Sequence, residues 1–159
     1  MAYGVRSKDN PNDVGRSADQ NQSVDNEAYL YANIRYIGIE VFDPLSNCLI
    51  GDGKKYFDIP ADLNGMNLVS CHAYHPTPGA TAGPTLINIH NETDNQDFLS
   101  TRLMIDTGEK GSDTAATPYV IDTAHDDLAT FDILRIDVDQ LPTGTVPKGL
   151  ILTLGFQHP

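Results

Sequence analysis

The chain has 159 residues, of which 40% are apolar and 20% are charged, and it contains no tryptophan. Ten lysine and arginine residues stand against 22 aspartate and glutamate residues, which gives a net charge of −12. This length and composition predict one globular domain with polar appendages. A chain this acidic repels phosphate backbones and anionic lipids, so we expect neither a nucleic acid nor a membrane as partner.

The first 30 residues differ in composition from the rest and form a predicted N-terminal arm, which precedes one domain over residues 31–159. The arm is polar and holds almost nothing that would offset the entropy lost on ordering. Two alternatives stay open: a flexible tail, or an arm that becomes ordered on a neighbouring subunit. No signal peptide and no segment of transmembrane length is recognised, which predicts synthesis and assembly in a cytoplasm.

Alternation of apolar and polar residues predicts four strands in the first 90 residues, over residues 34–42, 54–59, 66–74 and 85–90. The residues expected to point inward include Ile37, Ile39, Val41, Val69, Cys71, Ala73, Ile87 and Ile89. We expect the segment from Asp43 to Asn47 to break the first strand. Gly51, Asp52 and Gly53 are expected to form a turn, because glycine tolerates positive φ.

Loops rich in glycine, proline and polar residues separate the later strands, which are expected over residues 99–106, 118–122, 134–139 and 150–157. One helical turn is expected between residues 108 and 116. Many short strands without a long amphipathic helix are typical of antiparallel sandwiches. The sequence therefore predicts an all-β fold, a single antiparallel β-sandwich of the jelly-roll kind, with an extended N-terminal arm.

The most regular alternation lies between Phe131 and Phe156, and it predicts a long hairpin or two neighbouring sandwich strands. Arg135, Asp137 and Asp139 lie on the outer face of the first of these strands. These charges are expected either to meet solvent or to pair across a subunit boundary.

Histidine, cysteine and tyrosine residues give no recognisable catalytic or metal motif. The five histidines, which lack zinc-ligand spacing, are predicted to lie on the surface: His72, His75, His90, His125 and His158. Cys71 is expected to behave as a small apolar residue, and a Cys48–Cys71 disulfide stays open. Four tyrosines are candidates for a sugar-stacking platform, but capping of strand edges or subunit contacts is favoured: Tyr36, Tyr56, Tyr74 and Tyr119.

Acidic residues gather in the segment from Asp122 to Asp127 and at Asp132, and carboxylates that converge in a loop are candidate Ca²⁺ ligands. The EF-hand spacing is absent, so Asx turns and solvated strand faces are the favoured interpretation. Asp132 itself is expected in a turn or at the entry to a strand, next to Thr130. We therefore assign no catalytic, cofactor-binding or metal residue, predict no cofactor and expect no enzyme activity.

Several segments in order resemble a family of small virion proteins of tailed bacteriophages. They are Gly51–Lys54, Ile59–Pro60, Leu63–Val69, Leu99–Glu109, Thr114–Pro118, Val120–Ala124, Asp126–Asp127, Leu134–Asp139 and Lys148–Leu150. The resemblance implies a jelly-roll sandwich displayed on the particle as a head decoration or cement protein, or as a tail accessory. It implies the major capsid protein or other virion proteins as partners, and no catalytic residue comes with it.

Within this interpretation we expect location in the virion and a homo-oligomer, with a trimer as the working guess. The alternative hypothesis is a host-surface binding module of the tail, collar or fibre that recognises glycans. It depends on the exposed tyrosines and on the acidic segment as a Ca²⁺ site.

Overall fold

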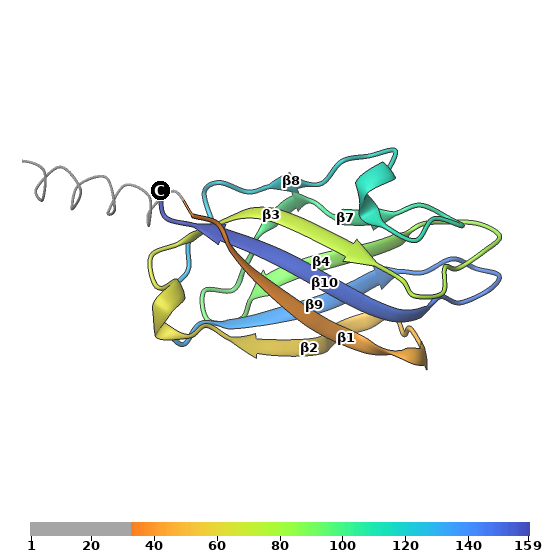
Figure 1. The fold of residues 1–159 in the computed structure, drawn as a ribbon, viewed down its shortest axis with the longest axis horizontal. Coiled ribbons are helices and arrows are strands. Elements are labelled where there is room, and N and C mark those ends of the chain that lie inside the picture. The colour runs from red at the N-terminus through yellow and green to blue at the C-terminus, as the bar shows by residue number, and fades with distance from the viewer. Residues whose placement is uncertain (1–32) are drawn as a thin grey trace, which may run out of the picture. The chain divides into compact units, whose positions relative to one another are not determined.

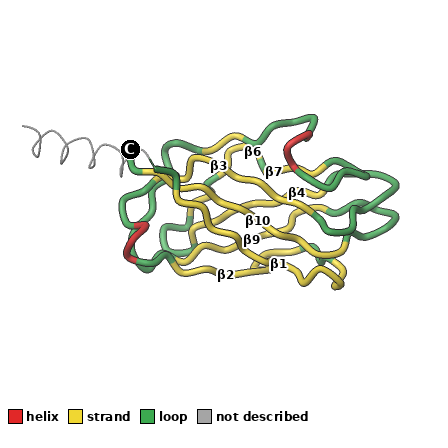
Figure 2. The backbone as a smooth tube through the Cα atoms, viewed as in Figure 1, coloured by secondary structure: helices red, strands yellow, loops and turns green. Residues whose placement is uncertain are grey.

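The computed structural model describes residues 33–159, and the predicted arm of residues 1–30 lies outside this range. Residues Ile34–Pro159 form a compact unit made of β-strands in two main layers (Figures 1 and 2). No helix in the described range has the length and apolar character needed to span a membrane.

The first sheet has three antiparallel strands in the order β1-β10-β3. They are β1 (Arg35–Asn47), β10 (Lys148–Gln157) and β3 (Asn67–Tyr74). Ile39 pairs with Leu152, and Leu152 pairs with Ala73, so the register aligns three inward apolar residues in one row. This sheet is called sheet A.

The second sheet, sheet B, has the order β2-β9-β4-β5, and β7 pairs with the same strand β4. Its strands are β2 (Gly51–Asp58), β9 (Ile133–Gln140), β4 (Thr85–Asn91), β5 (Gln96–Asp97) and β7 (Leu103–Ile105). A small third sheet joins β6 (Leu99–Thr101) to β8 (Val120–Ile121). Two short 3₁₀ helices, η1 (Ala61–Leu63) and η2 (Ser112–Thr114), lie in the connections.

The chain changes sheet at each connection from β1 to β4, and again from β9 to β10. The strands β1, β3 and β10 lie in sheet A, whereas β2, β4 and β9 lie in sheet B, where β5 and β7 also pair with β4. This order, with all pairs antiparallel, is a jelly-roll-like arrangement. The predicted all-β antiparallel sandwich is confirmed.

Apolar residues from both sheets form one core. β9 contributes Leu134, Ile136 and Val138, and β10 contributes Leu150, Leu152, Leu154 and Phe156, all fully buried. The alternation predicted between Phe131 and Phe156 is confirmed for these residues. Its two strands do not form a hairpin, since β9 lies at the centre of sheet B and β10 at the centre of sheet A.

Two predicted strand boundaries near the first connection are wrong. β1 does not break at Asp43 but continues to Asn47, with register shifts on either side of Phe42. Pro44 is tolerated because β1 is an edge strand, where one side of the backbone needs no ladder partner. Gly51 and Gly53 have positive φ as expected, 129° and 65°, but they lie in a bulge at the start of β2 rather than in a turn.

The inward assignment of Val69 is also wrong. Leu68 is 1% exposed and Val69 is 37% exposed, whereas Cys71 and Ala73 point inward as predicted. The cause is a register shift between β3 and β10: Leu68 pairs with Phe156, but Ser70 pairs with Gly155. Val69 is the extra residue of this β-bulge, so the alternation changes phase there.

The strand predicted over residues 99–106 is divided in two at Arg102. The first part, β6, pairs with β8, and the second part, β7, pairs with β4 of sheet B. Leu103 and Ile105 are buried as expected. The predicted helical turn between residues 108 and 116 is present as η2.

The two edge strands of sheet A differ in whether another segment covers their outer edge. The outer edge of β3 is covered by the connection after β7, because Cys71 N donates to the Tyr119 hydroxyl and Ala73 N donates to Ser112 Oγ, both at 3.0 Å. The outer edge of β1 has no such cover among the described residues, and its bulges and Pro44 make it irregular.

Candidate functional site

His75 is buried at the end of β3, with only 1% of its surface exposed, so its assignment to the surface is wrong. Its Nδ1 lies 2.6 Å from the carbonyl oxygen of Gly149, and its Nε2 lies 2.9 Å from Thr85 Oγ1. A carbonyl only accepts, so Nδ1 carries the proton and Nε2 accepts from the threonine hydroxyl. Both nitrogens of the neutral ring are thereby satisfied.

Cys48 lies next to this histidine, with its Sγ 3.8 Å from His75 Nδ1 and 3.4 Å from the Gly149 carbonyl oxygen. Burial raises the pKa of the Cys48 thiol to about 12. The thiol is therefore protonated and enclosed, and the Nδ1 proton is already bound to a carbonyl. This pair is a structural contact rather than a cysteine–histidine catalytic pair.

Cys71 is likewise buried among core residues, and burial raises its pKa to about 12. Both cysteines are free thiols. The predicted behaviour of Cys71 as a small apolar residue is confirmed.

We expect the stability of the domain to fall as the pH is lowered from about 8 to about 5.5, through the unperturbed histidine pKa. Burial lowers the pKa of His75, an effect that its bond to the Gly149 carbonyl opposes. The folded state therefore binds this proton less readily than the unfolded chain, so stability is complete above the unfolded pKa and is lost below it. Urea unfolding at a series of pH values measures the loss.

The substitution His75→Gln should lower stability at all pH values but remove this part of the pH dependence. His72→Gln is the matched control, because His72 lies on the outer face of the same strand with 45% of its side chain exposed. An unchanged pH dependence in His75→Gln would contradict the assignment.

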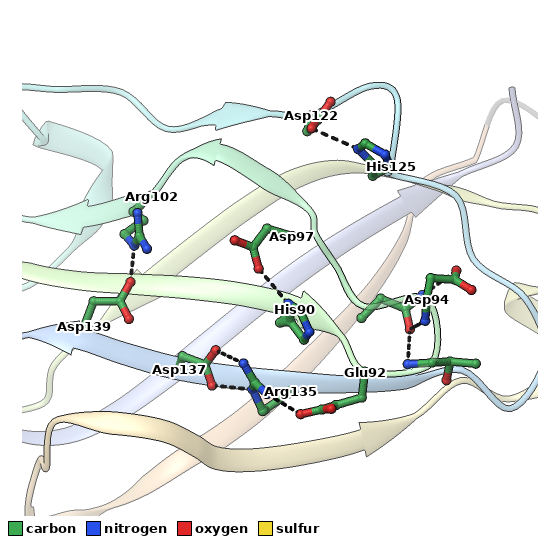
Figure 3. A network of polar contacts seen from close by, with 12 residues as sticks. His90, Glu92, Asp94, Asp97, Arg102, Asp122, His125, Arg135, Asp137 and Asp139 are labelled. Atoms are coloured by element: carbon green, nitrogen blue, oxygen red, sulfur yellow. Dashed lines mark hydrogen bonds and ion pairs between the residues drawn. The ribbon is translucent and has the colours of Figure 1, made fainter.

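The outer face of sheet B carries a row of charged and polar side chains (Figure 3). Arg135 donates to Asp137 through Nε at 2.8 Å and through Nη2 at 2.9 Å, and it also contacts Glu92. Asp137 in addition accepts the Gly53 backbone N–H at 2.8 Å. The hydrogen bonds that Arg135 donates to the Asp137 carboxylate raise the pKa of Arg135 further above its usual range.

Asp137 is only 2% exposed, so the expectation that it meets solvent or pairs across a subunit boundary is wrong. Its partners come from its own strand and from the β2 bulge. Asp139 pairs with Arg102 of the same domain, and both side chains are partly exposed. The charges of this face are thus neutralised mainly within the domain.

Two further polar groups complete this face. His90 Nδ1 lies 2.7 Å from Asp97 Oδ1, which joins β4 to β5, and the His90 side chain is only 12% exposed. Asn88 is buried opposite Asp137 in the β4–β9 register. Among residues 33–159, Asn88 Oδ1 is the single buried side-chain oxygen or nitrogen without a hydrogen-bond partner.

The acidic residues considered as Ca²⁺ ligands have separate partners. Asp122 accepts the Ala124 N–H and contacts His125, whose hydrogen bond is the main cause that lowers the Asp122 pKa. Asp126 is buried and bonds Asn67 at 2.8 Å, and burial raises its pKa. The Asx turn expected in this segment is present at Asp122.

Asp132 is buried in a turn, as expected. Its Oδ2 accepts the Ala129 N–H at 2.9 Å and a proton of the Asn91 side-chain amide at 3.0 Å. No group of three or more His, Cys, Asp or Glu side chains suited to a metal ion occurs in the described part of the chain.

The four tyrosines do not form one platform. Tyr36 and Tyr74 lie on the two outer strands of sheet A, and Tyr56 lies on β2 of sheet B. Tyr119 is partly buried, and its hydroxyl accepts the Cys71 N–H. The favoured interpretation, capping of a strand edge, is confirmed for Tyr119.

A shallow cleft of about 310 Å³ lies where the chain passes from β6 to β7. It is lined by Leu86, Ser100, Thr101, Arg102, Met104 and Thr117. Sequence reasoning missed this site, because its residues come from three separate segments and match no motif. No local sequence signal marks the division, because the inward positions Leu99, Leu103 and Ile105 keep one alternation phase across Arg102.

The fold defines the class of the protein as an antiparallel jelly-roll sandwich. No protein-family model, curated protein or solved structure matches the chain.

Proposed function

We propose that the protein is a non-enzymatic structural protein of a tailed-phage virion, and that it decorates or cements the assembled head. The resemblance of the segments between Gly51 and Leu150 to small phage virion proteins supports this proposal. The observation that carries it in the structure is an exposed apolar tip between β1 and β2.

Three large apolar residues define this apolar tip: Leu45, Leu49 and Ile50 are 84%, 61% and 58% exposed. Isolated apolar residues on a surface are ordinary, but three highly exposed ones within six positions give this connection the composition of an interaction site. Burying one such side chain contributes about 1.5–3 kcal/mol, so this tip supplies substantial binding free energy.

The tip is also held in place by its neighbours. Cys48 is 1% exposed, its N–H donates to the Pro147 carbonyl at 2.9 Å, and its Sγ contacts Gly149. Leu45 N donates to Asp43 Oδ1 at 2.9 Å. A tip already anchored to β10 loses little conformational entropy on binding, which favours a stable contact.

In this proposal the partner is the major capsid protein or another virion protein, and the decorating unit is a homo-oligomer, with a trimer preferred. A protein that binds only the assembled shell stabilises that shell by mass action. Stabilisation of this kind requires contact area and a stable fold but no reactive group.

The test is cosedimentation of the full-length protein with the phage's expanded heads, prepared without this protein. The triple substitution Leu45→Ser, Leu49→Ser and Ile50→Ser should weaken binding about 100-fold or more, given the free energy of burying three apolar side chains. Phe131→Ser is the control: Phe131 is 77% exposed and lies beyond the opposite end of β2, where its N–H donates to Ile59.

Wild-type affinity of the triple variant for heads would contradict a role for the tip. Failure of the wild-type protein to bind heads, together with its recovery from purified tails, would replace head decoration by a tail location.

A further inference from the structure

The cleft beside β6 and β7 combines an apolar floor with polar walls. Leu86 and Met104 are directly paired between β4 and β7, and both lie on the outer face of sheet B. Ser100, Thr101 and Thr117 contribute three hydroxyl groups, and Arg102 contributes its guanidinium. The cleft exists because the strand divides at Arg102, so that β6 diverges from sheet B while β7 remains in it.

The chemistry of the lining favours a ligand with several hydroxyl groups and one apolar face. A threonine hydroxyl can donate one hydrogen bond and accept others, whereas Ser100 Oγ already donates to the Val120 carbonyl oxygen at 3.3 Å and is left to accept. These walls therefore match groups that both donate and accept. The Leu86–Met104 floor suits a C–H surface. The volume of about 310 Å³ lies at the lower end of the range for small-molecule sites, about 300–1,000 Å³.

The ion pair at the edge of the cleft restricts the ligand further. Arg102 Nε donates to Asp139 Oδ2, with about half of the arginine side chain and a quarter of the aspartate side chain exposed (Figure 3). The guanidinium has further N–H donors and the carboxylate has further acceptor sites, side by side. Two neighbouring hydroxyl groups, one accepting and one donating, complement such a pair.

Charge argues against an acidic ligand. An anionic group bound to the remaining N–H donors of Arg102 would lie beside the Asp139 carboxylate, and it would approach a protein of net charge −12. Long-range repulsion of this kind lowers the rate of encounter with anions. A neutral ligand has neither disadvantage.

We propose that this cleft binds a neutral sugar unit, with its C–H face on Leu86 and Met104 and its hydroxyls on Arg102, Asp139 and Thr117. The residues that line this cleft are different from those of the apolar tip. It gives the protein a weak carbohydrate-binding activity in addition to its proposed structural function.

The test is an NMR titration of the full-length protein with the methyl glycosides of glucose, galactose and mannose, with N-acetylglucosamine, and with glucuronate as the charged comparison. At least one neutral sugar should shift the amides of Ser100, Thr101, Arg102 and Thr117 saturably, with a dissociation constant of about 1–10 mM. Glucuronate should bind more weakly.

Two substitutions in the cleft distinguish specific sugar binding from nonspecific binding. Arg102→Ala and Thr117→Val should each weaken binding by about tenfold, because each removes hydrogen bonds to the sugar. Arg35→Ala and Thr153→Val, on sheet A, are the matched controls and should leave the affinity unchanged.

Three results would overturn the proposal: no saturable shift in the cleft with any neutral sugar up to about 50 mM, tighter binding of glucuronate, or unchanged affinity in both cleft variants. Shifts that map to Tyr36 or Tyr74 instead would place sugar binding on sheet A and would equally reject the cleft.

Discussion

Replacing Phe156 with alanine is expected to lower the free energy of unfolding by about 3–5 kcal/mol. Phe156 is fully buried on β10, where it pairs with Arg35 of β1 and with Leu68 of β3. Its removal leaves a cavity near the end of the central strand of sheet A, which the neighbouring strands cannot fill without breaking their ladders. Such a loss is a large part of the total stability of a domain, typically about 5–15 kcal/mol.

Urea unfolding followed by circular dichroism measures this loss, and Phe131→Ala is the matched control. Phe131 is 77% exposed, so its truncation should change the free energy of unfolding by less than about 0.5 kcal/mol. Equal effects at the two positions would show that the burial at β10 is wrongly assigned.

Replacing Arg135 with methionine is expected to destabilise the domain by about 3–5 kcal/mol. The substitution leaves Asp137, which is 2% exposed, with the Gly53 N–H as its remaining hydrogen-bond donor. Burying a carboxylate without a compensating cation is costly, and the loss should exceed that of removing an exposed ion pair. The same unfolding experiment measures it.

The double substitution Arg135→Met and Asp137→Asn should recover much of the lost stability, because the buried charge is then absent and the amide oxygen can still accept from Gly53. Arg102→Met is the comparison for an exposed pair and should cost no more than about 1 kcal/mol. A loss of that size in Arg135→Met would show that the Asp137 carboxylate does not depend on Arg135.

Substitutions in the Arg135–Asp137 pair also test whether the outer face of sheet B stabilises the domain or contacts another subunit. A charge reversal at Asp137 should lower the stability of the isolated protein, since its partners lie within the domain. If the charge-reversed variant kept its stability but bound the particle more weakly, Asp137 would instead be assigned to a contact between subunits.

Most of the sandwich was predictable from the sequence because its core strands keep a strict period of two. Ile87 and Ile89, and the apolar residues of β9 and β10, alternate without interruption and are buried as the pattern predicts. The prediction of inward residues failed where the alternation of buried and exposed positions shifts by one residue. The exposure of Val69 follows from a bulge opposite Gly155, more than 80 residues away in the chain, and no local pattern reports it.

The candidate sites were less predictable because each depends on a long-range partner. His75 is buried because Gly149 and Thr85 satisfy both ring nitrogens, and the first of these lies 74 positions away. The alternation placed Asp137 on the outer face of its strand, where side chains usually meet solvent. The bulge at Gly53 lies against it instead, and the Gly53 N–H donates to its carboxylate. The cleft needs three segments and the division at Arg102, which only the paired strands reveal.

The positions of β9 and β10 have a consequence for how the chain folds. Each is the central strand of its sheet, although both follow every other strand in chain order. β1 and β3 therefore have no ladder partner until β10 has been synthesised, and β2 has none until β9. β4 can pair earlier with the short strands β5 and β7, but its longest ladder also requires β9. Folding is dominated by distant pairings, which are slow to form. Earlier strands should stay open on the ribosome until the C-terminal strands emerge, and closure of both sheets should then occur as one late event.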